Sequence, residues 1–536
     1  MSRVLWLVLP ELVLCLAAVL IAMIGVGASG PTWPDAPRYT NAAAMFYEWV
    51  HSGRFLSPFQ FAYENYARYP GFSIPYHPPG VPVMMGTFFL VTGVSYTAAR
   101  LFTALCMAGC CVLLAVLLRR VGCGRLASLM AAALFLTTPE VARWNRDTMS
   151  EIPALLLFLI ASLVFVSGYY ANRPGRIWIA FALALVAILS RITIIGLLPA
   201  WGLFMLLKKD YRKAFSPHIL IPAALCLIAT FAYMKFASTY ARIETEISGL
   251  SLHFDQWSFF GFFAGETMVW GTMWIGLLSL VALLFVPRND GTKLILAWLL
   301  SVILFKVMLF TTPEIRHFIF IFPAMAALAA IPLTHFNRTK VQRAIVWSVA
   351  VLALGANVMA WSQIPTGVVG YGTTATQLAR QEKPGNIFMA CWHDQDLIFH
   401  YRSLVSRHDR LMIRSDRTFA IRLSDYAERP VKKVVPDVAE ALETIRKGRI
   451  RYLLTCTSSL PGYDNRPYDF LLAEELVRKH PDQFVNVSES HVAWQFGPGQ
   501  HRSVVTLWEY TGPMRQGPSE LKLVVPTADI ILEPTK

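Results

Sequence analysis

A series of apolar runs limits how this chain can fold, because each run is close to the length that a helix needs to cross a lipid bilayer. A crossing takes about 20 mostly apolar residues, and a helix lets every backbone N–H and C=O bond within its own segment. The sequence therefore predicts a polytopic α-helical membrane protein with about eleven spans. The predicted spans are 5–28, 97–118, 126–142, 152–171, 177–190, 194–207, 218–236, 269–287, 294–311, 317–334 and 344–362.

Some of these apolar runs are short for a membrane crossing. The ranges 177–190 and 194–207 flank Ser190-Arg191, and they form either two short crossings around a tight outer turn or one irregular hairpin. The run 81–94 is shorter still than a normal crossing and predicts a juxtamembrane helix. The segment 30–96 is therefore expected to be a large outer loop, partly helical, whose many aromatic residues suit the membrane interface.

The composition supports a membrane protein, because 55% of the residues are hydrophobic and 15% are charged, with a mean hydropathy of +0.47. A soluble enzyme is less apolar than this. The net charge of +14 would suit a nucleic-acid partner. The Lys and Arg residues cluster instead in short loops between the apolar runs, as membrane topology requires, so the sequence predicts no nucleic-acid binding.

Basic residues also predict the orientation of the spans, because cytoplasmic loops are enriched in Lys and Arg. They recur in every second loop, which places these loops in the cytoplasm and the tail after 363 on the opposite side of a plasma or inner membrane. A cleaved signal peptide at 1–29 is the alternative, which the length of its apolar stretch disfavours. The basic residues are Arg3, Arg119, Arg120, Arg125, Arg173, Arg176, Lys208, Lys209, Arg212, Lys213, Arg288, Lys293, Arg338, Lys340 and Arg343.

The region 363–536 differs in character from 1–362, and the sequence predicts a separate soluble domain outside the cytoplasm. Charged residues become more frequent, and short β-like runs alternate with helical patterns, as in an α/β domain. Cys391 and Cys456 lie in this region, and both a disulfide and a pair of buried free thiols stay open. The expected strands are 386–392, 411–415, 452–456, 484–487 and 504–510, and the expected helices are 436–447 and 468–480.

Ionisable residues near the outer ends of the spans are the candidates for chemistry, because a charge at the membrane is usually functional or specifically paired. Asp35 follows the first span and precedes a predicted helix at 36–50, which it would also suit as an N-cap. Glu151 stands directly before the span 152–171 and has the same two interpretations. Spacing alone leaves both interpretations open.

Several short motifs accompany the predicted spans in a characteristic order. They are Asp35-x-x-Arg38-Tyr39, His77-Pro78-Pro79, Ala99-Arg100-Leu101, the run 146–153, Ser190-Arg191, and Arg316-His317 before Pro323. This order, over about residues 1–340, resembles the GT-C class of polyprenyl-phosphate-sugar glycosyltransferases. The protein O-mannosyltransferases and the lipid A aminoarabinose transferases belong to that class.

The resemblance implies an enzyme and a role for each candidate residue. It implies that Asp35 is the catalytic base for the acceptor hydroxyl. It implies that Glu151 is a second acid, which orients the acceptor, assists Asp35 or holds a divalent cation as a possible cofactor. The leaving phosphate needs positive charge, which Arg191 is best placed to supply. The substrate-binding residues implied in this way are Arg38, Tyr39, His77, Arg191, Arg316 and His317.

The function implied by this resemblance is inverting transfer of a sugar from a polyprenyl-phosphate-linked donor to an acceptor on the extracytoplasmic face. The resemblance leaves open whether the donor sugar is a hexose or a pentose. It also leaves open whether the acceptor is a lipid, a glycan or a protein. The alternative is a polytopic transporter or lipid flippase, which also has many helices with scattered charges. A transporter is expected to have repeated halves, whereas this sequence has no visible repeat and concentrates its acids in outer loops.

Overall fold

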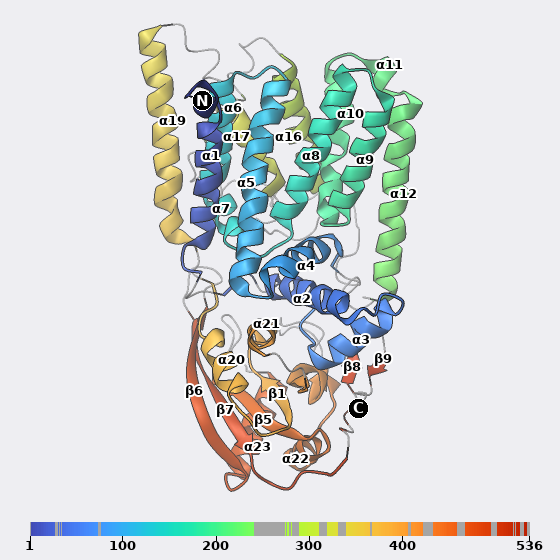
Figure 1. Ribbon diagram of the computed structural model, residues 1–536, viewed down its shortest axis with the longest axis vertical. Coiled ribbons are helices and arrows are strands. Elements are labelled where there is room, and N and C mark those ends of the chain that lie inside the picture. Colours follow the sequence, from blue (N-terminus) through green and yellow to red (C-terminus); the bar gives the residue numbers. More distant parts are fainter. Residues whose placement is uncertain are drawn as a thin grey trace.

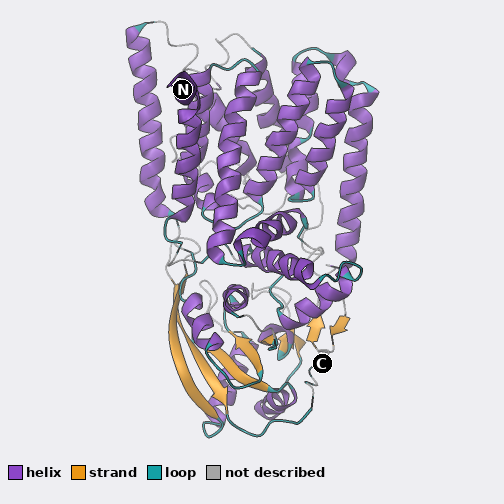
Figure 2. Ribbon diagram, in the orientation of Figure 1, coloured by secondary structure: helices purple, strands orange, loops and turns teal. Residues whose placement is uncertain are grey.

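A computed structural model of the chain has two parts that lie end to end, a helical bundle and a region with a β-sheet (Figure 1). Figure 2 shows that the strands are confined to the second part. The structure describes 2–26, 30–72, 77–240, 289–309, 319–330, 339–364, 367–405, 409–421, 432–457, 467–494, 501–521, 523–525 and 530–532, apart from the single positions 32, 34, 518 and 520, and also the isolated positions 274, 276, 277 and 280.

The bundle consists of apolar helices that run roughly parallel to one another (Figure 1). Among the described residues, four helices are long and apolar enough to cross a membrane, namely α5 (Tyr96–Arg120), α8 (Glu151–Tyr170), α12 (Pro217–Tyr240) and α19 (Lys340–Ala360). The other bundle helices are α1 (Ser2–Met23), α6 (Arg125–Thr137), α7 (Pro139–Asn145), α9 (Pro174–Ile188), η1 (Ile192–Leu197), α10 (Pro199–Leu207), α11 (Tyr211–Ala214), α16 (Asp290–Leu309) and α17 (Phe322–Ala330).

A helix lies at every predicted span that the structure describes, whereas the predicted span 269–287 falls almost entirely outside the described residues. Several of these helices are shorter than a full crossing, so the predicted count of about eleven spans stays a prediction. The chain turns at Ser190-Arg191, because α9 ends at Ile188 and η1 begins at Ile192, and this turn fits both two short crossings and one irregular hairpin.

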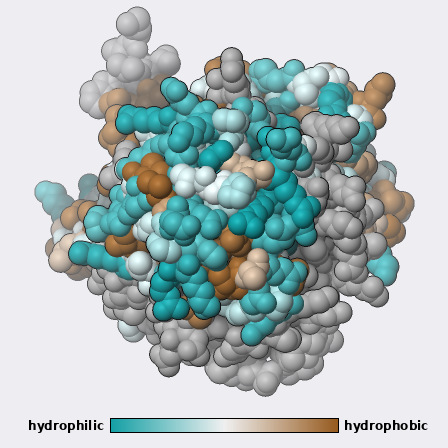
Figure 3. Space-filling view, turned by 90° about the horizontal axis from the view of Figure 1, so that it is seen from below, coloured by the Kyte–Doolittle hydropathy of each residue, from teal (hydrophilic) through white to brown (hydrophobic). Residues whose placement is uncertain are grey.

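The two ends of the molecule differ in the side chains that they expose. Helix α12 exposes Ile228 and Phe231 at 63% and 59%, and α19 exposes Leu352 at 70%, as helices that face lipid do. Seen from the sheet end, the described residues present mainly hydrophilic side chains (Figure 3). This difference fits a bundle that lies in lipid and a sheet-bearing region that lies in water.

The basic loops gather at the end of the bundle away from the sheet. Helix α11, which contains Arg212 and Lys213, lies at that end (Figure 1). Helix α5 begins beside the sheet-bearing region, where Tyr96 packs on Phe399, and it ends with Arg120 at the far end. Cytoplasmic loops are enriched in Lys and Arg, so this arrangement supports the predicted topology.

We fuse after Lys536 a reporter that works only outside the cytoplasm, and we expect it to be active. The reason is that the sheet-bearing region lies at the opposite end from the basic loops. The measurement is reporter activity in cells, compared with a fusion placed in the loop between α5 and α6, which is expected to show the opposite pattern. If a reporter that works only in the cytoplasm is active when fused after Lys536, the predicted topology is wrong.

The outer loop 30–96 forms helices between the bundle and the sheet-bearing region (Figure 1). They are α2 (Ala36–Ser52), α3 (Pro58–Arg68) and α4 (Gly80–Thr92), and α4 matches the juxtamembrane helix predicted at 81–94. Proline stands in the first turn of α2 and of α3, where its missing N–H costs no hydrogen bond. Gly53 ends α2 with a φ of +67°, a conformation that glycine adopts without strain.

The C-terminal region contains a five-stranded mixed sheet with the order β2-β1-β5-β7-β6. Strand β1 pairs in parallel with β2 and β5, and β7 pairs antiparallel with β5 and β6. The predicted strands are confirmed, because each of them forms one strand of this sheet. The strands are β1 (Asn386–Ala390), β2 (Met412–Arg414), β5 (Ile450–Cys456), β6 (Phe484–Trp494) and β7 (His501–Tyr510).

Helices pack beside this sheet, and two of them match the predicted helices at 436–447 and 468–480. Every residue of β1 is buried, as expected for a central strand with continuous apolar sequence. Cys391 and Cys456 are both buried free thiols, so the disulfide alternative is not formed. The remaining elements of the region are η3 (Trp361–Gln363), α20 (Tyr371–Ala379), α21 (Asp394–Leu404), η4 (Ser415–Arg417), α22 (Val438–Lys447), α23 (Tyr468–Lys479), β3 (Ala420–Ile421), β4 (Lys432–Lys433), β8 (Leu523–Val525) and β9 (Ile530–Leu532).

The boundary between 1–362 and 363–536 stays a prediction. The sheet and its helices enclose a hydrophobic core of their own, to which the outer loop adds Ala67 and Tyr69. We therefore expect a fragment that begins at Gly367 to fold as a soluble, monomeric α/β unit without transferase activity. Circular dichroism and size-exclusion chromatography measure this, and aggregation of fragments with every nearby start point would contradict the boundary.

Candidate active site

One face of the N-terminal turn of α2 carries three of the predicted site residues. Asp35, Arg38 and Tyr39 are three and four residues apart, a spacing that places their side chains within one helical turn on the same face. Arg38 Nη1 lies 3.7 Å from Asp35 Oδ1, and the Asp35 side chain is 21% exposed. The carboxylate is thus accessible and stands beside a cation.

The structure contradicts the interpretation of Asp35 as a helix cap. Asp35 occupies the N-cap position of α2, but its side chain accepts no capping hydrogen bond. Its φ of −81° and ψ of −18° are helical, whereas a capping residue usually has an extended backbone. Pro37 lies in the first turn and has no N–H to offer. The carboxylate of Asp35 therefore has no capping role to fulfil.

The hydroxyl of Tyr39 is the point where separate outer segments of the chain meet. It lies 3.3 Å from Nδ1 of His77 and accepts hydrogen bonds from Ser150 Oγ at 3.0 Å and Arg191 Nη1 at 3.3 Å. The Tyr39 ring is buried and packs against the His77 ring with a centroid distance of 4.8 Å. Burial raises the pKa of Tyr39, so its hydroxyl stays protonated and remains a potential donor.

Arg191 and Glu151 form a buried ion pair beside Tyr39. Arg191 Nη2 lies 3.0 Å from Glu151 Oε1, and the two side chains are 11% and 0% exposed. Arg191 Nη1 also donates to Ser150 Oγ at 3.4 Å. Glu151 is the first residue of α8, yet its carboxylate oxygens accept no hydrogen bond from described residues. The interpretation of Glu151 as a helix cap is therefore wrong, because the carboxylate pairs with Arg191 instead.

A close approach of two backbone segments brings His77 to the turn that carries Arg191. The backbone N–H of Gly80 donates to the carbonyl of Leu189 at 3.0 Å. A Cβ added at Gly80 would collide with Ser190 Oγ and would lie 2.9 Å from the Leu189 carbonyl oxygen. Glycine at position 80 thus permits a contact that any larger residue would open.

The segment with most of these residues matches a known family, and most of the chain matches solved structures. Residues 76–234 match the family model described as dolichyl-phosphate-mannose-protein mannosyltransferase. ArnT from Cupriavidus metallidurans, solved bound to undecaprenyl phosphate, is similar with a TM-score of 0.59 and 14% identity, over 94% of this chain and 98% of that chain. The oligosaccharyltransferase of Archaeoglobus fulgidus, in the apo form, has a TM-score of 0.55 and 12% identity, over 84% and 69%. No curated protein sequence matches the chain.

Both solved structures are GT-C glycosyltransferases, and each match includes the bundle together with the sheet-bearing region. The chain has a GT-C fold. The resemblance drawn from the short motifs is thereby confirmed at the level of the fold. Identities of 14% and 12% support the fold alone, so the substrates of this GT-C protein are a matter of proposal.

The GT-C fold brings most of the predicted site residues together. Four of them join one network through the Tyr39 hydroxyl and the Arg191 guanidinium, and Asp35 and Arg38 share the helical face of Tyr39. The other two predicted substrate-binding residues, Arg316 and His317, lie outside the described residues. The network consists of Tyr39, His77, Glu151 and Arg191.

Two residues of this site were not predicted from the sequence. Ser150 bridges Tyr39 and Arg191. The feature of the sequence that could have indicated Ser150 is its position directly before Glu151, at the start of a span. Gln395 comes from α21 in the C-terminal region, and its Oε1 accepts a hydrogen bond from Arg38 Nε at 3.3 Å. No pattern in the sequence links positions 357 residues apart.

The divalent cation considered for Glu151 stays a prediction. Within the part of the chain that the structure describes, no group of three or more His, Cys, Asp or Glu side chains is arranged to hold a metal ion. The described neighbour of the Glu151 carboxylate is a guanidinium, which already balances its charge. These residues therefore fit an ion pair better than a metal site.

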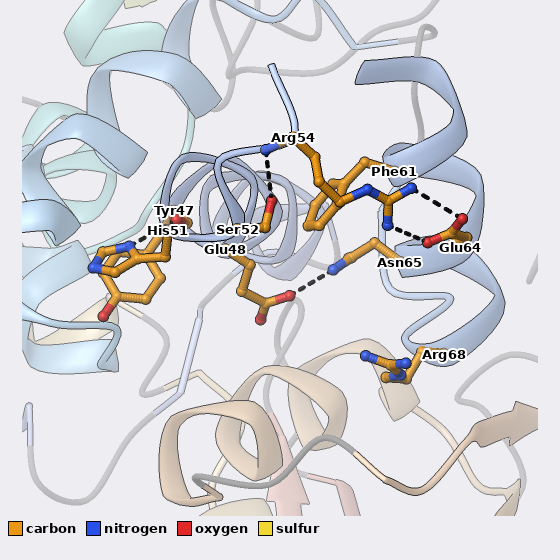
Figure 4. A pocket seen from close by; sticks show the side chains of 9 residues that line it. All are labelled: Tyr47, Glu48, His51, Ser52, Arg54, Phe61, Glu64, Asn65 and Arg68. Atoms are coloured by element: carbon orange, nitrogen blue, oxygen red, sulfur yellow. Dashed lines mark hydrogen bonds and ion pairs between the residues drawn. The ribbon is translucent and has the colours of Figure 1, made fainter. Parts of the chain in front are cut away.

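A separate hollow lies at the other end of α2 (Figure 4). It has a volume of about 450 Å³, and its walls are held by Arg54 paired with Glu64 at 2.5 Å and by Asn65 donating to Glu48 at 2.5 Å. From Asp35 to Glu48 the helix rises about 20 Å, so this hollow is distinct from the face that carries Asp35. Its lining residues are Tyr47, Glu48, His51, Ser52, Arg54, Phe61, Glu64, Asn65 and Arg68.

Proposed function

We propose that this GT-C protein is an inverting glycosyltransferase that moves a sugar from a polyprenyl-phosphate-linked donor to an acceptor hydroxyl outside the cytoplasm. The observation that carries the proposal is an accessible carboxylate, Asp35, one helical turn from the polar network around Tyr39 and Arg191, whose donors suit a phosphate. The similar ArnT was solved bound to undecaprenyl phosphate, a lipid of the proposed donor class.

Asp35 is proposed to act as the base for the acceptor. The acceptor oxygen attacks the anomeric carbon of the donor sugar while its proton moves to the Asp35 carboxylate. The bond between the anomeric carbon and the phosphate oxygen breaks in the same displacement, and the polyprenyl phosphate leaves with the bonding electron pair. A single displacement inverts the configuration at the anomeric carbon.

Arg191 is proposed to stabilise the leaving phosphate with help from Tyr39 and His77. Phosphate carries more negative charge as the bond breaks, so preorganised donors at this point lower the barrier. The bonds from Arg191 Nη1 to Tyr39 and Ser150 are 3.3 and 3.4 Å long, whereas a charge-assisted bond to phosphate is about 2.7–2.9 Å. Exchange of the long bonds for phosphate oxygens is therefore favourable, and the protonated Tyr39 hydroxyl becomes a second donor.

Glu151 is proposed to position Arg191 and not to exchange a proton. Its carboxylate is fully buried and lies 3.0 Å from Nη2, on the opposite terminal nitrogen from the one that contacts Tyr39. The guanidinium is planar and its N–H donors have a rigid geometry, so an ion pair that fixes Nη2 also sets the direction of Nη1. This role differs from that of the second acid expected from the sequence.

The transporter or flippase alternative has less support than the transferase. The similar solved structures are glycosyltransferases, and the acids discussed above lie at the outer end of the bundle, not at its midplane. A transporter would concentrate its charged residues near the middle of the membrane.

The test of the proposed function is to incubate membranes that contain the protein with a panel of radiolabelled polyprenyl-phosphate sugars. Transfer of label to a lipid, glycan or protein fraction is expected with one donor of the panel, and the product should have the opposite anomeric configuration. Membranes with the Asp35→Asn variant are the control. Absence of transfer from every donor, or a product with retained configuration, would contradict the proposal.

A further inference from the structure

Helix α21 of the C-terminal region packs against α2, below which it lies in Figure 1, and residues near both ends of α21 bond to α2. Asn41 Nδ2 donates to the backbone carbonyl of Gln395 at 2.9 Å. Further along, Arg402 Nη2 lies 2.8 Å from Glu48 Oε1, and the Arg402 side chain is 1% exposed. The Phe399 ring packs on Phe89 of α4. The C-terminal region is therefore held in a defined position against the helix that carries Asp35.

The docking bond from Asn41 uses the backbone carbonyl of Gln395, so this bond does not depend on the Gln395 side chain. The side chain reaches instead toward the proposed site, where Oε1 accepts from Arg38 Nε at 3.3 Å. The same guanidinium places Nη1 3.7 Å from Asp35 Oδ1. A glutamine of the C-terminal region, an arginine and the proposed base thus form one continuous chain of contacts.

We infer that Gln395 is a positioning residue for the transfer reaction, which acts by holding the Arg38 guanidinium against the Asp35 carboxylate. The inference rests on the proposed function, since it takes Asp35 as the base. It assigns to the C-terminal region a part in positioning the proposed base of the outer loop.

The geometry of arginine explains why one bond at Nε has this effect. The Arg38 side chain is long and 20% exposed, so the direction of its guanidinium depends on the bonds that it makes. The guanidinium is planar with donors in a fixed fork, so a bond at Nε sets the direction in which Nη1 points. Without the Gln395 acceptor, Arg38 loses this restraint. The Asp35 carboxylate then loses a fixed partner, and misplacement of a catalytic group by about 1 Å can cost 10²-fold in rate.

The test compares two variants of the full-length protein that differ at the acceptor atom. Gln395→Met has a similar volume but no side-chain acceptor, and we expect kcat to fall about 10- to 100-fold with little change in the KM for the donor. Gln395→Glu keeps an acceptor oxygen for Arg38 and is expected to retain most of the activity. The matched control is Gln377→Met in α20. The Gln377 side chain accepts hydrogen bonds from Ser488 and Ser490 of β6, and its loss should leave kcat unchanged.

A double-variant cycle and a stability measurement separate positioning from docking. Arg38→Met and Gln395→Met are expected to be non-additive in kcat, because both break the same chain of contacts. The thermal midpoint of Gln395→Met in detergent should match that of Gln377→Met, since the backbone bond to Asn41 remains.

Each outcome of this test has a defined meaning. Three results would overturn the role of Gln395 but leave the proposed function intact, because the wild-type enzyme still transfers sugar. They are a wild-type kcat in Gln395→Met, additive effects of Gln395→Met and Arg38→Met, and a loss of activity that a lower thermal midpoint explains. Absence of transfer by the wild-type protein from every donor would overturn the proposed function and this inference with it.

Discussion

Asp35→Asn is expected to leave a folded, membrane-inserted protein whose rate of sugar transfer is about 10² to 10⁴ times lower. Asn has nearly the size of Asp but takes no proton from an acceptor hydroxyl. The structure removes the competing explanation, because the Asp35 side chain makes no capping hydrogen bond that the change could affect. The measurement is kcat with the donor found in the panel of polyprenyl-phosphate sugars, together with the thermal midpoint in detergent.

A matched control for this change is Asp437→Asn. Asp437 is a true cap, since its Oδ1 accepts from Glu440 N at 2.9 Å at the start of α22. Asn caps as well as Asp, so neither activity nor stability should change there. Transfer by Asp35→Asn at a rate near that of the wild type would remove Asp35 as the base and make Glu151 the leading candidate.

Arg191→Ala is expected to lower both stability and donor use, because it leaves the Glu151 carboxylate buried without its cation. Glu151 is 0% exposed, and loss of one partner of a buried ion pair typically costs about 3–5 kcal/mol. Arg191→Lys keeps the positive charge and loses the bidentate geometry, so we expect a smaller loss of kcat/KM for the donor. Thermal midpoints and donor titrations measure the two effects separately.

The double variant Arg191→Met with Glu151→Gln distinguishes the structural effect from the chemical one. Removal of both charges together is expected to restore much of the thermal midpoint, because no unpaired charge remains buried. Donor use should stay low, since no cation faces the leaving phosphate. The control is Arg119→Ala, which breaks a more exposed pair with Glu11 on the opposite side of the bundle from the outer loop. Recovery of donor use in the double variant would exclude Arg191 from the phosphate site.

Part of the site was predictable because its residues lie close together along the chain. Asp35, Arg38 and Tyr39 follow one another within a helical turn, so their common face could be predicted from spacing. The meeting of Tyr39 with Arg191 could not, because it depends on the packing of α4 against the turn at 189–190. The resemblance to GT-C enzymes suggested these residues, but the pairing of Arg191 with Glu151 came from the structure.

The sequence by itself determined the membrane class, two of the outer loop helices (α2 and α4) and the strands of the C-terminal region. These features depend on local signals: the length of apolar runs, proline at helix starts, and alternation or continuity of apolar residues. A helix in lipid satisfies its backbone groups within its own segment, so its presence is encoded locally. A strand bonds to neighbouring strands, and the sequence marks it only by its apolar pattern.

The tertiary structure alone decided which of these segments meet. The strand order β2-β1-β5-β7-β6 and the contact of Gln395 with Arg38 join residues far apart in sequence. It also decided whether the Asp35 and Glu151 carboxylates cap helices or face other groups. Such contacts depend on the packing of whole elements against one another, and a single side chain carries no local sign of the partner it will meet.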